Sequence, residues 1–436
     1  MASEQLQDRP AEVLARLLRF DTSNPPGDER ECIAWVETLL GGLDAEVRLL
    51  ARDPERPNLV ARLAGRGERP PLLLQGHVDV VAARGKWEHP PFAGEQAGGY
   101  VWGRGALDMK GGVAMMLAAF MRVAASGARP PGDVILCLLA DEEAGSDLGA
   151  NYLVSSHADL FDGVRYALGE FGGFTMDIAG RRIYPIMVAE KQICWTLARI
   201  RGAAGHGSLG LRGGATAKLG KLLSRLDRRR LPVHVTPVVR SMVEAIAAEL
   251  PTAATLPLRA LLQPALTDPL LDVLGERARL FDPLLHNTAS ANIIAAGEKI
   301  NVVPDEASAQ LDCRLLPGFG PEQLFAELRA LSRVELELEV LRHDPVAAEP
   351  DLGMFATLAS ILRELDSSAR PVPMLLPGAT DGRFFARLGI QTYGFLPMPL
   401  PAELQFMRLI HAENERVPVE AIEFGTHAIT RVLERF

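Results

Sequence analysis

Cysteine is scarce in this sequence. Only four of its 436 residues are cysteines, and they lie far apart with no Cys-x-x-Cys pair: Cys32, Cys137, Cys194 and Cys313. This spacing argues against a disulfide framework and against a cysteine zinc site, and it is typical of reduced thiols buried in a cytoplasmic protein.

Long apolar runs are also missing. The longest, Val113 to Met121, has about half the length of a membrane-spanning helix. The first ten residues, MASEQLQDRP, have no apolar core, so we expect no signal peptide and a cytoplasmic location. The net charge is −9, and the one dense basic run, 225–230, contains no aromatic residue. We therefore expect neither a membrane nor a nucleic acid as a partner.

Several catalytic and nucleotide-binding motifs are absent as well. The chain has no Gly-x-Ser-x-Gly turn, no Walker loop, and no Gly-x-Gly-x-x-Gly after its first predicted strand. None of the cysteines neighbours a histidine. Nucleophilic-triad chemistry and phosphate-loop chemistry are therefore poor fits.

The length favours two domains. Apolar runs alternate with helical patterns in the first half, which predicts an α/β fold with a mainly parallel sheet flanked by helices. The pattern of predicted helices and strands changes near residue 182, where strand-like segments with helices between them suggest an inserted α+β domain. We predict a first domain of residues 1–181 and 346–436, interrupted by an insert of residues 182–345.

Acids and a histidine follow three of the predicted strands. The run PLLLQG ends at His77 and Asp79, DVILCLLA ends at 141–143 (Asp-Glu-Glu), and RYALG ends at Glu170. A further acid, Asp108, precedes a predicted helix in WGRGALDMKGG. Because the carboxyl ends of parallel strands form one edge of a sheet, these side chains are expected to converge there. For the His77–Asp79 pair alone, an ordinary polar turn is the alternative.

Such a group of side chains would repel one another unless a cation lay between them. Imidazole and carboxylate without thiolate suit zinc, manganese or cobalt, and one carboxylate can bridge two ions. Two metal ions roughly 3.5–4 Å apart polarise a carbonyl group and supply hydroxide at neutral pH. The pattern therefore favours a metal-dependent hydrolase.

The motifs resemble those of a known family. The segments GHVDVV, KWEHPPFAGE, WGRGALDMKGG, ADEEAGS and LGEFGG resemble, in order and spacing, the di-zinc aminoacylase and glutamate-carboxypeptidase family, which includes acetylornithine deacetylase and succinyl-diaminopimelate desuccinylase. The likeness resumes at RGAAGHGS, GEKINVVPDEASAQLDCRLLPG, PGATDGRFFARLGI and HAENERV. It covers most of the chain from about residue 60, except for roughly 230–285.

The resemblance implies two zinc ions per subunit, with cobalt or manganese as substitutes. The residues that it implies as metal ligands are His77, Asp108, Glu143, Glu170 and His411. Asp108 would bridge the two ions, and the peptide bond that follows it, Asp108–Met109, would be cis. Asp79 would orient His77, and Glu142 would be the general base.

The resemblance also implies residues that contact the substrate. His206, in the insert, would cross a homodimer interface to stabilise the oxyanion, so the insert would be a dimerisation or lid domain. Arg314 and Arg383 would hold the substrate's carboxylate, and Gly378 and Asn292 would face the same site. Many relatives have Thr-x-x-Pro-Thr before the asparagine, where this chain has TASAN over 288–292.

The resemblance implies hydrolysis of an amide bond in a dipeptide, at a carboxy-terminal residue, or in an N-acyl amino acid. A biosynthetic desuccinylase or deacetylase with the same machinery is the near alternative. A catalytically silent homologue that only binds small molecules is the remote one, although it would be expected to lack Glu142 or a metal ligand, and all are present.

Overall fold

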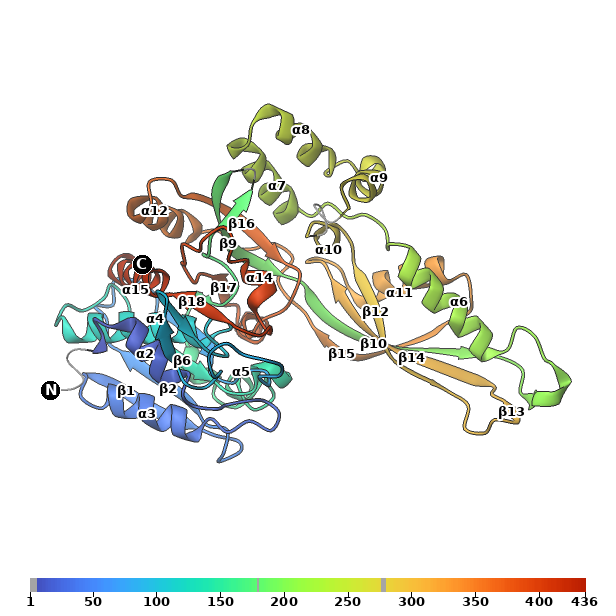
Figure 1. The fold of residues 1–436 in the computed structure, drawn as a ribbon, viewed down its shortest axis with the longest axis horizontal. Helices are drawn as coiled ribbons and strands as arrows, with labels where there is room; N and C mark the ends of the chain where they lie inside the picture. Colours follow the sequence, from blue (N-terminus) through green and yellow to red (C-terminus); the bar gives the residue numbers. More distant parts are fainter. Residues whose placement is uncertain (1–5, 179, 276–279) are drawn as a thin grey trace. The chain divides into compact units, whose positions relative to one another are not determined.

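The computed structural model describes residues 6–178, 180–275 and 280–436, and the chain divides into two compact units (Figure 1). Unit 1 extends to Val188 and resumes with Asp351–Met374 and Thr380–Phe436. Unit 2 comprises Ala189–Pro350 and Leu375–Ala379.

Within the described residues, the main sheet has nine strands in the order β1-β2-β6-β3-β7-β17-β9-β16, with β8 paired to β9. The strands are β1 (Ala45–Leu50), β2 (Asn58–Leu63), β3 (Leu72–His77), β6 (Val134–Leu139), β7 (Tyr166–Gly169), β8 (Met176–Ile178), β9 (Arg181–Glu190), β16 (Arg370–Leu376) and β17 (Gln391–Gly394). Strands β6, β3, β7 and β17 pair in parallel. Antiparallel pairs flank them, β1–β2 and β2–β6 on one side and β17–β9 on the other. The predicted α/β class is confirmed, with a mixed sheet whose centre is parallel.

The central strands owe their position to continuous apolar sequence. Every residue of β3 (LLLQGH) and of β6 (VILCLL) is buried, as expected for strands that are covered on both faces. Gly76 leaves room for the side chains at the start of the next helix, because a Cβ atom there would lie 2.5 Å from Cε of Met109 and 3.3 Å from Cγ2 of Val113.

Helices cover both faces of this sheet. They are α2 (Pro10–Leu17), α3 (Arg30–Leu40), α4 (Lys110–Ala125), α5 (Ala150–Ser156), α12 (Phe355–Leu365), α13 (Gly382–Phe385), α14 (Phe406–Leu409) and α15 (Val419–Arg435). Helix α4 packs against β3, β6, α2 and α15, and its methionines 115, 116 and 121 are buried core residues. On the other face, side chains of α5 and α13 join a cluster with alternate residues of β3 and β6.

Short elements complete unit 1. A three-stranded sheet, β18-β5-β4, contains β4 (Glu95–Ala97), β5 (Tyr100–Trp102) and β18 (Arg416–Pro418). The 3-10 helices are η1 (Glu142–Ala144), η2 (Ala158–Phe161) and η5 (Ala386–Leu388). Strand β18 pairs with β5 and so ties the segment after His411 to the chain near residue 102.

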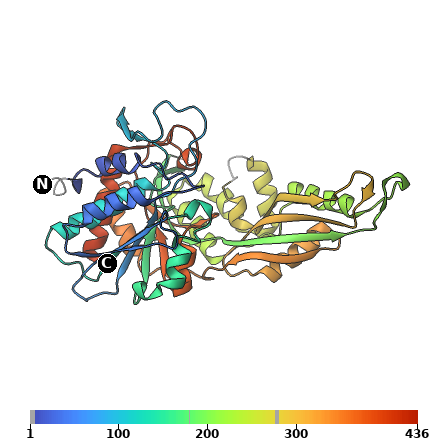
Figure 2. The same ribbon diagram turned by 90° about the horizontal axis from the view of Figure 1, so that it is seen from below.

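Unit 2 is built on a four-stranded antiparallel sheet in the order β12-β14-β10-β15, whose long strands run side by side in Figures 1 and 2. These strands are β10 (Gln192–Arg201), β12 (Thr288–Ala296), β14 (Glu306–Leu315) and β15 (Glu337–Asp344). Strand β11 (Gly205–His206) pairs with β13 (Val302–Val303), and η3 (Gly207–Leu209) follows β11. The helices are α6 (Ala215–Arg228), α7 (Pro237–Glu249), α8 (Thr252–Ala260), α9 (Pro264–Leu274), α10 (Asp282–Leu285) and α11 (Pro321–Ser332). Helices α6 and α11 bury their apolar side chains with those of β10 and β14 in one core.

Across residues 6–178, 180–275 and 280–436, no helix combines the length and the apolar character that crossing a membrane requires.

Candidate active site

The predicted metal-binding side chains meet at one edge of the unit 1 sheet. His77 is the last residue of β3, Glu143 lies in η1 after β6, and Glu170 follows β7 directly. These three strands are parallel neighbours, so their carboxyl ends lie at the same edge. Asp108 reaches this edge from the loop that precedes α4.

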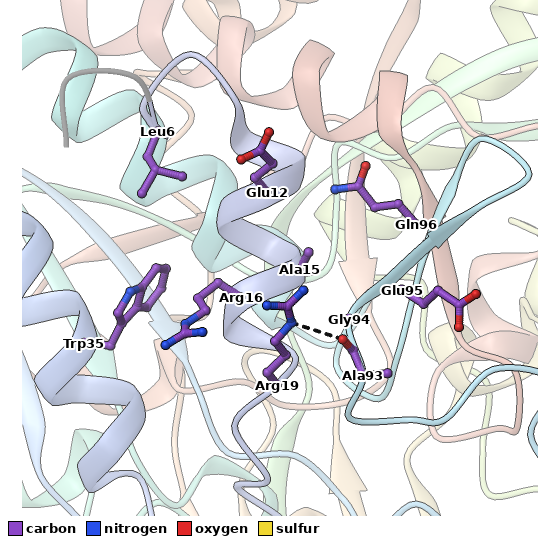
Figure 3. A pocket seen from close by; sticks show the side chains of 10 residues that line it. All are labelled: Leu6, Glu12, Ala15, Arg16, Arg19, Trp35, Ala93, Gly94, Glu95 and Gln96. Atoms are coloured by element: carbon purple, nitrogen blue, oxygen red, sulfur yellow. Dashed lines mark hydrogen bonds between the residues drawn. The ribbon is translucent and has the colours of Figure 1, made fainter. Parts of the chain in front are cut away.

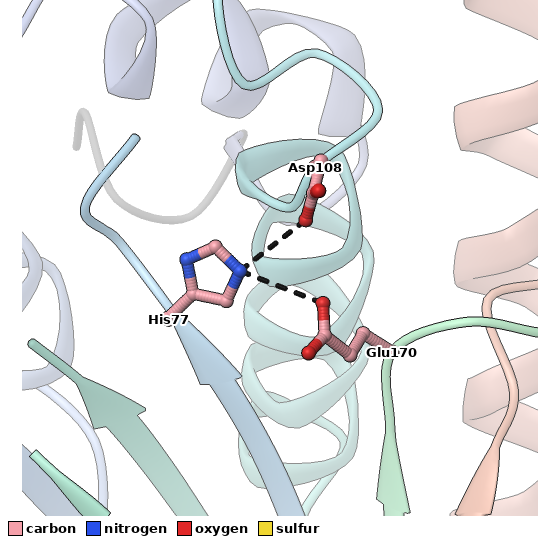
Figure 4. Close-up of side chains that lie close together, drawn as sticks. All are labelled: His77, Asp108 and Glu170. Carbon is pink, nitrogen blue, oxygen red and sulfur yellow. Dashed lines mark hydrogen bonds and ion pairs between the residues drawn. The ribbon is translucent and has the colours of Figure 1, made fainter. Parts of the chain in front are cut away.

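The first group of ligand atoms is buried (Figure 4). Nε2 of His77 lies 3.3 Å from Oδ1 of Asp108 and 3.5 Å from Oε2 of Glu170. Figure 4 shows both carboxylates directed at the same imidazole nitrogen. These three side chains are close enough together to hold one ion.

A second group shares Asp108 with the first. Nε2 of His411 lies 3.2 Å from Oδ2 of Asp108 and 3.3 Å from Oε1 of Glu143. The two oxygens of Asp108 therefore face different histidines. Two groups of one histidine and two carboxylates that share one carboxylate suit a pair of divalent cations.

The electrostatics agree with a cation-binding role. Burial raises the pKa of Glu170 to about 8, although His77 opposes the shift. Hydrogen bonds that His411 donates to the Asp108 and Glu143 carboxylates raise its pKa to about 10. Burial disfavours protonation of His77, but its carboxylate neighbours raise its pKa well above the usual value. Several buried carboxylates thus share a small space, an arrangement that a bound cation would stabilise. The donor set contains no thiolate and fits zinc, manganese or cobalt.

Asp79 connects His77 to the loop after β6. Nδ1 of His77 lies 2.9 Å from the main-chain oxygen of Asp79 and 3.5 Å from Oδ1 of its carboxylate. The carboxylate accepts hydrogen bonds from the backbone N–H groups of Glu142 (3.1 Å) and Glu143 (3.0 Å). Nδ2 of Asn24 donates to the same carboxylate at 2.9 Å. The Asp79 side chain therefore contacts the loop more closely than it contacts the histidine.

Glu142 projects from the same loop. Burial, together with the negative charge of Glu170, raises its pKa well above that of an ordinary glutamate. Its Oε1 lies 3.7 Å from Nη1 of Arg383, an arginine with only 3% of its surface exposed. A carboxylate with a raised pKa can accept and return a proton near neutral pH, as a general base must.

The residues that hold this loop in place were not predicted from the sequence. Asp141 has a left-handed backbone (φ 69°), and its Oδ1 accepts a 3.1 Å hydrogen bond from Nδ2 of Asn24. Arg56 approaches the same Oδ1 at 3.5 Å and pairs with the buried Glu29. The segment TSNPPGDE, which contains Asn24 and Glu29, was the only sequence signal for them.

A second brace holds the Asp108 loop. Glu415, fully buried, accepts backbone N–H groups of Leu107 (2.7 Å) and Asp108 (3.2 Å) through Oε1. Its Oε2 pairs with Nη1 of Arg104 at 2.5 Å. The Asp108–Met109 peptide bond is cis, as the resemblance implied. Glu415 was visible in the sequence as the last residue of HAENE, but its role was not predicted.

Four other predicted residues lie in unit 2. His206, at the end of β11, is exposed, and its Nδ1 lies 2.8 Å from Oγ of Ser208. Asn292 is exposed at an irregularity in the register of β12, and the main-chain oxygen of Gly378 accepts N–H of Lys191 at 3.2 Å. Their functional roles stay predictions.

The fourth, Arg314, lies on β14. Its guanidinium donates to both oxygens of Asp312, through Nε at 2.8 Å and Nη2 at 3.2 Å. A substrate carboxylate would therefore have to use the Nη1 side of this group. Its role in binding the substrate stays a prediction as well.

A surface cavity of about 760 Å³ lies elsewhere in unit 1, between α2, α3 and the β4 segment (Figure 3). Arg16, Arg19, Trp35 and Glu95 are among its lining residues, and Nε of Arg19 donates to the main-chain oxygen of Ala93. None of the predicted site residues lines this cavity.

Comparison with known proteins agrees with the geometry. Residues 73–435 match the model of peptidase family M20/M25/M40. The chain is 30% identical over 380 residues to the human N-fatty-acyl-amino acid synthase/hydrolase PM20D1, covering 84% of this chain and 74% of that protein. It is 28% identical over 441 residues to succinyl-diaminopimelate desuccinylase of Paracoccus denitrificans, covering 98% of each.

A solved structure shares the fold. The M20 family metallo-carboxypeptidase from Sulfolobus solfataricus superposes with a TM-score of 0.68 at 18% identity, over 98% of this chain and 99% of that one. The extent of the family match identifies the chain as a member of peptidase family M20/M25/M40 and thus as a metallohydrolase, in agreement with its two adjoining groups of potential metal ligands.

Proposed function

We propose that this protein hydrolyses the amide bond of an N-acyl amino acid or a small peptide, using two zinc ions held at the edge of the unit 1 sheet. The observation that carries the proposal is Asp108, whose two oxygens face His77 and His411 in two adjoining groups of ligand atoms. His77, Asp108 and Glu170 would hold one ion, and Asp108, Glu143 and His411 the other. Cobalt or manganese would be possible substitutes.

The metal ions, when bound, would polarise the amide carbonyl and make hydroxide available at neutral pH. Glu142 would accept a proton from the attacking water and pass it to the leaving amine. Its position supports this role, because its backbone is held by Asp79 and its carboxylate lies beside Arg383. Asp79 would fix His77 and the Glu142 loop together.

The N-acyl amino acid is favoured by the human relative, whose name refers to N-fatty-acyl amino acids. A desuccinylase is the second candidate, because the Paracoccus relative matches along 98% of both chains. In either case the substrate would carry a free carboxylate, which Arg314 would bind through the Nη1 side of its guanidinium. Asn292 and Gly378 would contact the same substrate.

A homodimer formed through unit 2 is part of the proposal. Ile293 and Ile294 on β12, an edge strand of the unit 2 sheet, are 56% and 54% exposed. An unpaired edge with apolar side chains favours pairing with a second copy. His206 of one subunit would then stabilise the oxyanion in the site of the other.

A cytoplasmic location is also proposed. All four cysteines are free and buried, as expected for a protein that folds in a reducing compartment.

The test is a hydrolysis screen with metal-free protein to which zinc, cobalt or manganese is added. The panel contains N-acetyl, N-succinyl and N-dodecanoyl amino acids and dipeptides. Release of free amino acid that depends on added metal would support the proposal, and the best acyl group would decide between the two candidates. A protein that holds two metal ions per chain but cleaves no member of the panel would contradict it.

A further inference from the structure

Arg383 lies in the interior of unit 1, on α13. Its Nη1 donates to the main-chain oxygen of Thr380 at 2.6 Å, and its Nη2 donates to Oγ of Ser146 at 3.2 Å. Its guanidinium carbon lies 4.4 Å from the centre of the Phe384 ring. Only 3% of the surface of Arg383 is exposed, so its side chain contacts other protein groups and almost no solvent.

The charge environment of Arg383 does not suit a substrate carboxylate. Asp381 is 1% exposed; burial raises its pKa to about 6, and the positive charge of Arg383 opposes this shift. Oε1 of Glu142 lies 3.7 Å from the same guanidinium. A substrate carboxylate would join two carboxyl groups, those of Asp381 and Glu142, around one cation and would first have to reach a buried group. Burying a further charge under these conditions is costly.

The contacts of Arg383 converge on the loop that carries Glu142. Ser146, fully buried, ends this loop with a left-handed backbone (φ 68°), and its N–H donates to the main-chain oxygen of Asp141 at 2.6 Å. Asp79 accepts the backbone N–H groups of Glu142 and Glu143. Arg383 forms a 3.7 Å ion pair with the Glu142 carboxylate and donates to the Ser146 hydroxyl.

We propose that Arg383 is a positioning residue that holds the Glu142 carboxylate and its loop in the reactive arrangement, and that it does not bind the substrate's carboxylate. The inference rests on the proposed role of Glu142 as the base. A planar guanidinium can contact Glu142, Ser146 and Thr380 together, which a lysine ammonium at the end of a flexible chain cannot do in the same geometry.

A double-mutant cycle tests the proposal. Arg383→Met and Arg383→Lys are made in the wild-type background and in Glu142→Gln. Each protein is assayed with the fastest-cleaved member of the substrate panel and with the carboxamide of that compound. Bound zinc is measured by elemental analysis, and folding by thermal melting.

In the wild-type background, Arg383→Met should lower kcat by at least ~30-fold on both compounds, with KM changed by less than ~3-fold and zinc content unchanged. In the Glu142→Gln background the same substitution should lower kcat by less than ~3-fold, because the carboxylate that it positions is already gone. Arg383→Lys should recover part of the lost activity.

The matched control is Arg387→Met. Arg387 lies over the same Phe384 ring, at 4.7 Å from its centre, but it is exposed and its Nη1 donates to Asn151. Its replacement should leave kcat within ~2-fold of wild type, so that a loss specific to Arg383 is not a packing effect on the ring.

Three results would overturn the assignment. One is a rise in KM confined to the substrate with a free carboxylate, which would make Arg383 a substrate ligand. Another is an equal loss of kcat in both backgrounds, or loss of zinc or of cooperative melting in both Arg383 variants, which would make it structural. The third is inactive wild-type protein, which would remove the proposed function and this assignment together. With active wild type, failure of the cycle removes the Arg383 role alone.

Discussion

Replacing Asp79 with asparagine would test how the two halves of the site are joined. The Asp79 carboxylate accepts three N–H groups, from the backbones of Glu142 and Glu143 and from the side chain of Asn24, at 2.9 to 3.1 Å. An asparagine keeps the shape but turns one oxygen into an NH₂ group. In either orientation, that NH₂ group faces at least one N–H donor.

The cost follows from these contacts. A hydrogen bond to a buried charged acceptor contributes about 1.5–3 kcal/mol, and leaving its donor unsatisfied costs a further ~1–3 kcal/mol. Removing a fully buried charge offsets part of this loss of stability, because burial disfavours the ionised form of Asp79. We expect the free energy of unfolding of the metal-free protein to fall by about 2–4 kcal/mol.

Urea unfolding of metal-free wild type and Asp79→Asn measures this loss. Asp53→Asn is the control, because Asp53 accepts one exposed backbone N–H, that of Glu55 at 3.0 Å, and its replacement should cost no more than about 0.5 kcal/mol. Zinc affinity is measured by competition with a chelator. A stability change below ~1 kcal/mol, accompanied by a drop in zinc affinity of more than ~100-fold, would show that Asp79 acts mainly on His77.

Three further outcomes are expected. Glu142→Gln should retain two zinc ions and lower kcat by at least ~10²-fold; elemental analysis beside kinetics checks this, and near-normal turnover would refute the assignment. Mixing Glu142→Gln with His206→Ala subunits should restore about a quarter of wild-type activity when half the dimers are hybrid, whereas a histidine acting within its own subunit predicts no recovery. Asp282 raises the pKa of His286 although burial opposes it, so the folded state holds this proton more tightly than the unfolded chain. The stability that this proton contributes is fully present below the unfolded-state pKa of about 6.5 and is lost as pH rises through the folded-state pKa. The urea midpoint should therefore fall more steeply between pH 6 and 9 in wild type than in His286→Gln. Parallel plots of urea midpoint against pH for the two proteins would contradict the role of His286.

The sequence by itself determined the elements that are buried on both faces. The runs at β3, β6 and β7 were predicted within two residues, because continuous apolar sequence between polar turns leaves few alternatives. Strand β1 was missed, since AEVRLL is largely exposed and forms a strand only by pairing with β2. Strands β4, β5 and β18 have three residues each, too few to show a periodicity.

The residue types of the site could also be predicted from the sequence, because the motifs around His77, Asp108, Glu143, Glu170 and His411 are specific in order and spacing. The tertiary structure alone decided what these side chains touch. Asn24 and Arg383 lie far from Glu142 in the sequence and reach its loop only through the packing of the first loop and α13. Hydrogen bonds and ion pairs act over about 3 to 4 Å, so partners more than a hundred residues apart are chosen by the fold and leave no spacing in the sequence.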